Sequence, residues 1–315
     1  MRRPVLIASI LALLSACDKP QEQPASDVPA APQTAVTPTS TILFQVFGAK
    51  DEPKLVPIVI ADGGHLAPIT LDANGWRLVD SLFFAKGKKL PIYRNGAESG
   101  MVEFVRGMWP DEGALYSLPA CSAVVPQALG KLDAKGFVEA SVEYLASTTP
   151  LKQPPAQRAV PTESEAPGRT LANTVAAAKQ IGKEEIAALD FVSRWLPTGA
   201  GPSGRTLFAS YIDPNGGDAG AGAGHTVMVM ALAEDSAGVH TPSYQHVSSG
   251  EARTVDFQRL VNHADLDGDG IDEILLEEWR YAGIPEVAVL KYAQGKWRLV
   301  FRVSQNWCLD TKKPD

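Results

Sequence analysis

Residues 265–273 crowd carboxylates together and so constrain how the chain can fold. They read Asp-Leu-Asp-Gly-Asp-Gly-Ile-Asp-Glu, so carboxylates that could share one centre stand at positions 1, 3, 5 and 9. Negative groups this close disfavour one another's charged form unless a cation lies among them. We therefore expect Asp265, Asp267, Asp269 and Glu273 to surround one metal ion, which requires a tight curl of the backbone here.

Two glycines and one main-chain carbonyl would complete this site. Gly268 and Gly270 allow the curl, because glycine adopts positive φ without steric cost. The carbonyl of Ile271, at position 7, would add a further oxygen. Calcium takes six to eight hard oxygen ligands, whereas magnesium needs a smaller and stricter octahedron. We predict one calcium ion with a structural role; the alternative is a tight Asp-Gly hairpin turn that holds no ion.

The segments around this loop distinguish between two known calcium-binding architectures. An EF-hand needs a helix on each side and a glutamate at position 12, but position 12 is Leu276 and residues 274–279 have a strand-like sequence. The loop instead resembles the DxDGDGxxD/E turn of FG-GAP and VCBS repeats, with Glu273 in place of the commoner aspartate. The resemblance covers residues 254–303, which is one blade. It implies the calcium turn but not a full β-propeller, which needs at least four blades.

The N-terminal sequence resembles that of a bacterial lipoprotein precursor. Residues 1–17 read MRRPVLIASILALLSAC, with two arginines followed by an apolar stretch over residues 5–14. That stretch is too short to span a hydrocarbon core of roughly 30 Å and is typical of a signal peptide. Leu14-Ser15-Ala16-Cys17 resembles a lipobox; the alternative is an ordinary secretory signal with a cysteine after small residues.

The resemblance to lipoproteins implies a cellular location for the mature protein. Residues 1–16 would be removed and Cys17 would carry lipid, palmitate included, which anchors the protein to a bacterial membrane facing the periplasm. Two or more acyl chains are needed for stable anchoring. Asp18 resembles the signal that retains lipoproteins in the inner membrane, and the choice between inner and outer membrane stays open.

The charge of the chain limits its partners. Removal of residues 1–16 takes away two of the 29 basic residues and none of the 36 acidic ones, which moves the formal net charge from −7 to −9. An acidic chain is poorly suited to binding nucleic acid by charge. We therefore expect no nucleic-acid partner, and contact with the membrane through the lipid alone. A protein or a glycan of the envelope would be the remaining kind of partner.

The chain divides by composition into a tether and two folded parts. Residues 17–40 are rich in Pro, Ala, Gln, Ser and Thr, which is typical of a disordered tether. Residues 41–147 alternate strand-like runs with one helical segment from Trp76 to Gly87, which predicts an α+β domain. A proline-rich linker follows at 148–168, and residues 169–197 predict short helices that end before Pro197.

The C-terminal part has the pattern of a mainly antiparallel β domain over residues 205–304. Short apolar runs separated by turn residues predict a meander. The expected strands cover residues 206–212, 226–233, 239–247, 254–262, 273–281, 287–292 and 297–303. Residues 305–315 would form a C-terminal tail.

Cysteine pairing and catalysis are less constrained by the sequence. With Cys17 assigned to lipid, Cys121 and Cys308 remain as an even pair in an oxidising compartment, which favours a disulfide between them. Two unrelated buried thiols are the alternative. No catalytic motif is present, and the five histidines lack a zinc-ligand spacing.

The sequence therefore predicts a lipid-anchored envelope protein. Its role would be that of a non-catalytic binding or envelope-support module. The alternative is an envelope hydrolase whose active site lies between the two domains.

Overall fold

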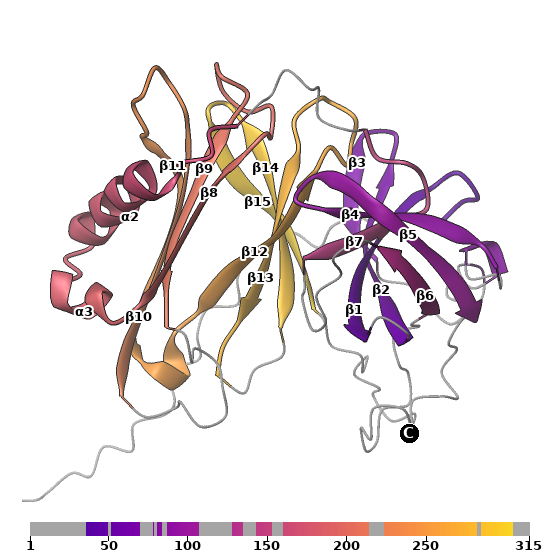
Figure 1. The fold of residues 1–315 in the computed structure, drawn as a ribbon, viewed down its shortest axis with the longest axis horizontal. Helices are drawn as coiled ribbons and strands as arrows, with labels where there is room; N and C mark the ends of the chain where they lie inside the picture. The colour runs from indigo at the N-terminus through magenta and orange to yellow at the C-terminus, as the bar shows by residue number, and fades with distance from the viewer. Residues whose placement is uncertain are drawn as a thin grey trace, which may run out of the picture. The chain divides into compact units, whose positions relative to one another are not determined.

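Three antiparallel β-sheets make up most of the described chain (Figure 1). The computed structural model describes residues 36–49, 52–69, 78, 81–83, 87–106, 128–134, 143–152, 160–213, 224–281 and 285–304. The predicted signal peptide and Cys17 lie outside these residues, as does most of the predicted tether. Its last residues, 36–40, form a turn in which the amide of Ser40 donates to the carbonyl of Thr37, and Val36 is buried.

The first sheet has seven strands in the order β1-β7-β4-β5-β6-β2-β3, and β1 also pairs with β2. Side chains of β1 alternate between two cores, as the period of a strand requires. Ile42 and Phe44 lie in a cluster among the strands of this sheet, whereas Leu43 belongs to a cluster shared with the third sheet. The strands are β1 (Thr41–Ala49), β2 (Glu52–Asp62), β3 (His65–Pro68), β4 (Lys89–Arg94), β5 (Ala97–Arg106), β6 (Ala128–Ala134) and β7 (Tyr144–Ser147).

The second sheet carries a helix on one face and the third sheet on the other. Leu171 and Val175 of α2 are buried against Leu207 and Val229 of this sheet, while Met230 lies in the core shared with the third sheet. The strand order is β11-β10-β9-β8. The elements are α2 (Glu165–Ala178), α3 (Lys183–Ala187), β8 (Asp190–Leu196), β9 (Thr206–Ile212), β10 (His225–Glu234) and β11 (Pro242–Glu251).

The third sheet is buried on both faces, which explains its continuous apolar runs. Ile274 and Leu276 contact the core shared with the second sheet, and Leu275 contacts the core shared with the first. Its strands follow the chain in the order β12-β13-β14-β15. A 3-10 turn, η2 (Ala252–Thr254), precedes β12 (Phe257–Ala264), β13 (Glu273–Trp279), β14 (Glu286–Ala293) and β15 (Lys296–Ser304).

The prediction of an α+β domain at residues 41–147 is wrong, because the region is mainly β. Among its described residues, only 78 and 81–83 are helical. Strands β6 and β7 were not predicted, because neither sequence has an alternating run of residues with high β-propensity. The two sequences are Ala-Leu-Gly-Lys-Leu-Asp-Ala and Tyr-Leu-Ala-Ser. Non-local pairing with β5, β2, β1 and β4 makes them strands.

The helical segment predicted at residues 169–197 is also only partly correct. Helix α2 begins earlier, at Glu165. The expected second helix is present as α3, but it ends at Ala187, and residues 190–196 form strand β8. Ile186 and Leu189 pack against the core of the second sheet, but Val192 is 39% exposed, so the apolar spacing does not continue as a helix to Val192. Pairing of β8 with β9 along its whole length overrides the local helical pattern.

The strands predicted within residues 205–304 are present, but they divide between two sheets, the first of which also contains β8 from the segment predicted to be helical. Each of the seven expected strands overlaps one of the strands β9 to β15, and the second of two successive four-stranded meanders contains the acidic segment. Within the residues that can be described, no helix is long and apolar enough to cross a membrane.

Candidate metal centre

The acidic segment is the turn between β12 and β13. The last pair of this hairpin joins Ala264 to Glu273, so residues 265–272 form the connection. Gly268 and Gly270 have φ values of 80° and 89°. This left-handed conformation is costly for residues with a Cβ atom, so the two glycines permit the curl expected from the sequence.

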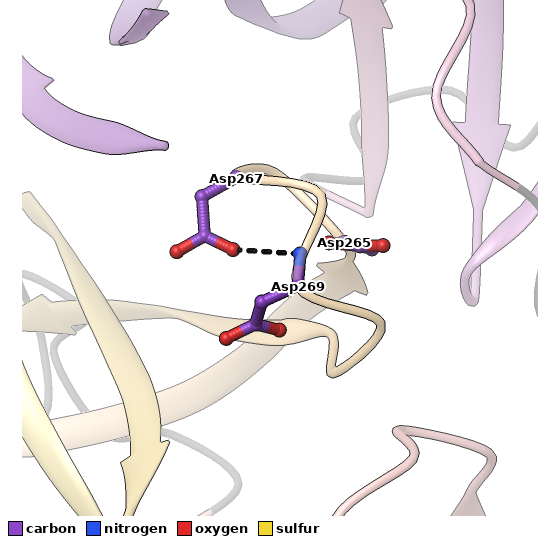
Figure 2. Close-up of side chains that lie close together, drawn as sticks. All are labelled: Asp265, Asp267 and Asp269. Carbon is purple, nitrogen blue, oxygen red and sulfur yellow. Dashed lines mark hydrogen bonds between the residues drawn. The ribbon is translucent and has the colours of Figure 1, made fainter. Parts of the chain in front are cut away.

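Three aspartates of this turn form a cluster that could hold a metal ion. Ligand oxygens of Asp265, Asp267 and Asp269 all lie within 4.8 Å of one another. Figure 2 shows the three side chains projecting from one turn, with the amide of Asp269 donating a hydrogen bond of 3.2 Å to Asp267. This convergence confirms the prediction that the three aspartates form a cluster able to hold a metal ion. The identity of the metal stays a prediction.

Backbone amides hold the carboxylates of Asp265 and Asp269 in place. The two oxygens of Asp265 accept hydrogen bonds from the amides of Gly268 at 2.7 Å and Gly270 at 3.1 Å. Asp269 accepts one from the amide of Ile271 at 2.8 Å. Because these donors are part of the main chain, the oxygens are positioned by the turn itself rather than by side-chain packing.

Burial and hydrogen bonding act in opposite directions on these two carboxyls. Partial burial raises the pKa of Asp265 above its ordinary value, and the amides of Gly268 and Gly270 offset only part of this effect. Burial acts in the same direction on Asp269, but hydrogen bonds from Lys291 and Ile271 hold the pKa of Asp269 below its ordinary value. Asp269 therefore carries its negative charge more readily than Asp265 does.

Glu273 is the most deeply buried carboxyl next to the turn. Its side chain is 1% exposed, and one oxygen accepts a hydrogen bond of 2.9 Å from the amide of Leu266. Burial, together with the charge of Asp267, raises the pKa of Glu273 to about 8. Its other oxygen lies 3.3 Å from the ammonium of Lys291.

Lys291, on β14, brings a positive charge to the cluster. Its ammonium donates to Asp269 at 2.7 Å and also contacts Asp267. Burial acts to lower the pKa of Lys291, but the hydrogen bonds to Asp267 and Asp269 raise it above its ordinary value. The lysine remains charged at neutral pH and offsets part of the negative charge of the turn.

The segment after β7 also contacts the turn. Lys152 forms an isolated antiparallel bridge with Asp265, and its ammonium donates to the carbonyl of Gly268 at 2.9 Å. A cavity of about 340 Å³ adjoins these groups, and its lining includes Asp62 and Gly64 of the first sheet. The acidic turn is thus bordered on this side by residues that are distant in the sequence.

Asn262 ties the start of the turn to the first sheet, and His263 contacts Asp272 near its end. The side-chain oxygen of Asn262 accepts from the amide of Gly96 at 2.9 Å, and its nitrogen donates to the carbonyls of Tyr93 at 3.2 Å and Glu143 at 2.7 Å. Nδ1 of His263 lies 2.6 Å from the carboxylate of Asp272, with both side chains buried. These contacts fix both ends of the acidic segment.

The roles of the remaining predicted site residues are not tested by the structure. The participation of Glu273 and of the Ile271 carbonyl as metal ligands stays a prediction, because the three-aspartate cluster does not include them. Cys17, Cys121 and Cys308 lie outside the described residues, so the lipid site and the disulfide stay predictions as well.

The sequence pattern does not predict the contribution of Lys291 to the acidic turn. The register of β13 and β14 pairs Ile274 with Leu290. The next pair along the ladder therefore brings Lys291 opposite Glu273, on the same face of the sheet. Strand register is set by pairing between distant segments, so a pattern read along one segment does not reveal this neighbour.

Comparison of the chain with protein-family models, with curated proteins and with solved structures gave no match.

Proposed function

We propose that the protein is a lipid-anchored component of the bacterial cell envelope in which one calcium ion, held by residues 265–273, stabilises the third sheet. Its role is to bind or support another envelope component, a protein or a glycan, rather than to catalyse a reaction. The observation that carries the metal proposal is the convergence of Asp265, Asp267 and Asp269 within 4.8 Å of one another.

The chemistry of the turn supports calcium in particular. All candidate ligands are oxygen atoms, which calcium prefers, and water can complete its flexible shell. A turn resembling that of FG-GAP and VCBS repeats would add the Ile271 carbonyl and Glu273. The turn joins two strands of a sheet that is buried on both faces, so a bound ion would stabilise the fold rather than take part in a reaction.

The lipid anchor is supported by the sequence of residues 1–17 alone. Metabolic labelling with a palmitate analogue in a bacterial host tests it. We expect the wild-type chain to incorporate label and to fractionate with membranes, whereas Cys17→Ala abolishes both. Cys121→Ala is the matched control and should retain the label. An unlabelled wild-type chain would overturn the lipid assignment.

Thermal unfolding of the full mature chain in detergent, with calcium or with a chelator, tests the metal assignment. At calcium about twenty times the dissociation constant, binding stabilises the folded state by about 2 kcal/mol. For a protein of this size, that corresponds to an increase in Tm of roughly 3–4 °C.

The aspartate variants make the thermal test specific. Asp267→Asn should abolish the shift while nearly preserving side-chain shape, and Asp190→Ala, at an exposed position of β8, should leave the shift unchanged. A wild-type Tm that is the same with calcium and with chelator would refute the proposal.

A further inference from the structure

The ammonium of Lys291 lies among the carboxylates that the proposed calcium ion needs. It is 2.7 Å from an oxygen of Asp269 and 3.3 Å from an oxygen of Glu273, and it also contacts Asp267. Two of these three carboxylates belong to the three-aspartate cluster. A positive group is therefore hydrogen-bonded to the oxygens that would coordinate a divalent ion.

The backbone that carries Lys291 lies outside the acidic turn, on a neighbouring strand. Lys291 belongs to β14, which pairs with β13 on one side and with β15 on the other, where Lys291 itself is opposite Arg298. Its side chain is 31% exposed, so part of it reaches solvent. Lysine carries its charge on a flexible four-carbon stem. The ammonium can leave the carboxylates by side-chain rotation, without a change in the sheet.

We infer that Lys291 is an internal cation that competes with calcium for the carboxylates of Asp267 and Asp269, so that calcium binding displaces its ammonium into solvent. The inference rests on the calcium site proposed above. A divalent ion and an ammonium cannot share these oxygens closely, because two positive charges a few ångströms apart repel each other. Lys291 thus raises the calcium concentration at which the site is half occupied.

This competition gives the acidic turn two folded states. Without calcium, Lys291 offsets the charge of the aspartates and the backbone amides of the turn keep their carboxylate partners. With calcium, the ion takes over that role and Lys291 is released. The turn therefore stays folded in a chelator, and calcium acts as an added stabiliser rather than as a condition for folding.

Calorimetric titration of calcium into the full mature chain, compared with Lys291→Met, tests the inference. Methionine has a similar length and no charge, so removal of the competitor should tighten calcium binding on the order of tenfold or more. Lys296→Met removes an exposed lysine near the β14–β15 turn and is the matched control, with the expected affinity unchanged. Calcium binding by Lys291→Met that is no tighter than that of the wild type would overturn the inference.

A second measurement follows the ammonium directly. Acylation of Lys291 by a mild reagent, quantified by mass spectrometry, should be slow in a chelator and faster in saturating calcium. An unchanged rate would contradict displacement. If the wild type binds calcium and Lys291→Met binds it no more tightly, only this inference is overturned. If neither chain binds calcium, the calcium proposal is overturned as well. Binding by the variant alone supports the competition and rejects calcium as a ligand of the wild type.

Discussion

Replacement of Asn262 by alanine should weaken the whole fold, because this one side chain joins three separate segments. Its oxygen accepts hydrogen bonds from the amides of Gly96 at 2.9 Å and His263 at 2.8 Å. Its nitrogen donates to the carbonyls of Tyr93 at 3.2 Å and Glu143 at 2.7 Å. The amide group thereby fills its bonding capacity on both atoms, between β12 and the first sheet.

The expected magnitude follows from the partners that alanine would leave behind. Three of the four hydrogen bonds are fully buried, so their backbone groups cannot all regain a partner from bulk water. A buried polar group that loses its partner costs about 1–3 kcal/mol. We expect Asn262→Ala to lower the free energy of unfolding by about 3–5 kcal/mol, on the assumption that some water enters the vacated space.

Equilibrium urea unfolding, followed by the fluorescence of the six tryptophans, measures this loss. Asn173→Ala is the matched control. Asn173 is exposed on α2 and accepts one hydrogen bond of 3.1 Å from Tyr211, so its replacement should cost less than about 1 kcal/mol. If Asn262→Ala were no more costly than Asn173→Ala, the reasoning that Asn262 links the first and third sheets would be refuted.

Three further predictions concern backbone conformation and pH. Gly270→Ala should cost about 1–2 kcal/mol, because φ is 89° and alanine is strained there; Gly270→Asn should cost less, and equal urea midpoints for the two variants would contradict this. Gly96→Ala should be more destabilising in the same assay than Gly270→Ala, since its Cβ would collide with the ring of His263, whereas Gly270 has open space around it. Burial raises the pKa of Glu234 above its ordinary value of 4.5. The folded state therefore binds the proton of this carboxyl more tightly than the unfolded state does. The free energy of unfolding should fall as the pH rises from 4.5 through the raised pKa. Urea midpoints measured across that range should lose this component of their pH dependence in Glu234→Gln, and an unchanged dependence would contradict the assignment.

The acidic turn was predictable from sequence because its geometry is local. The spacing of Asp265, Asp267 and Asp269, with a glycine after each of the last two, fixes both the curl and the convergence of the carboxylates. Hydrogen bonds between these aspartates and amides only two to five residues away then hold the arrangement. No distant segment is needed to form the cluster.

The features that escaped prediction depend on contacts between distant segments. Strand β8 has a helix-compatible sequence and becomes a strand through pairing with β9. Strands β6 and β7 have weak strand signals and are defined by partners on β5 and β1. Lys291 lies 24 positions beyond Asp267 and reaches it through the β13–β14 register. Such pairings are set by the packing of the sheets, which a single-sequence pattern does not encode.

A crystal structure of the protein grown with calcium tests most directly the proposal that calcium binds the acidic turn and displaces Lys291. We expect one ion bonded to oxygens of Asp265, Asp267 and Asp269 at about 2.3–2.6 Å, with the ammonium of Lys291 turned away from them. A structure at saturating calcium in which Lys291 still contacts Asp267 and Asp269, and no ion lies in the turn, would contradict it.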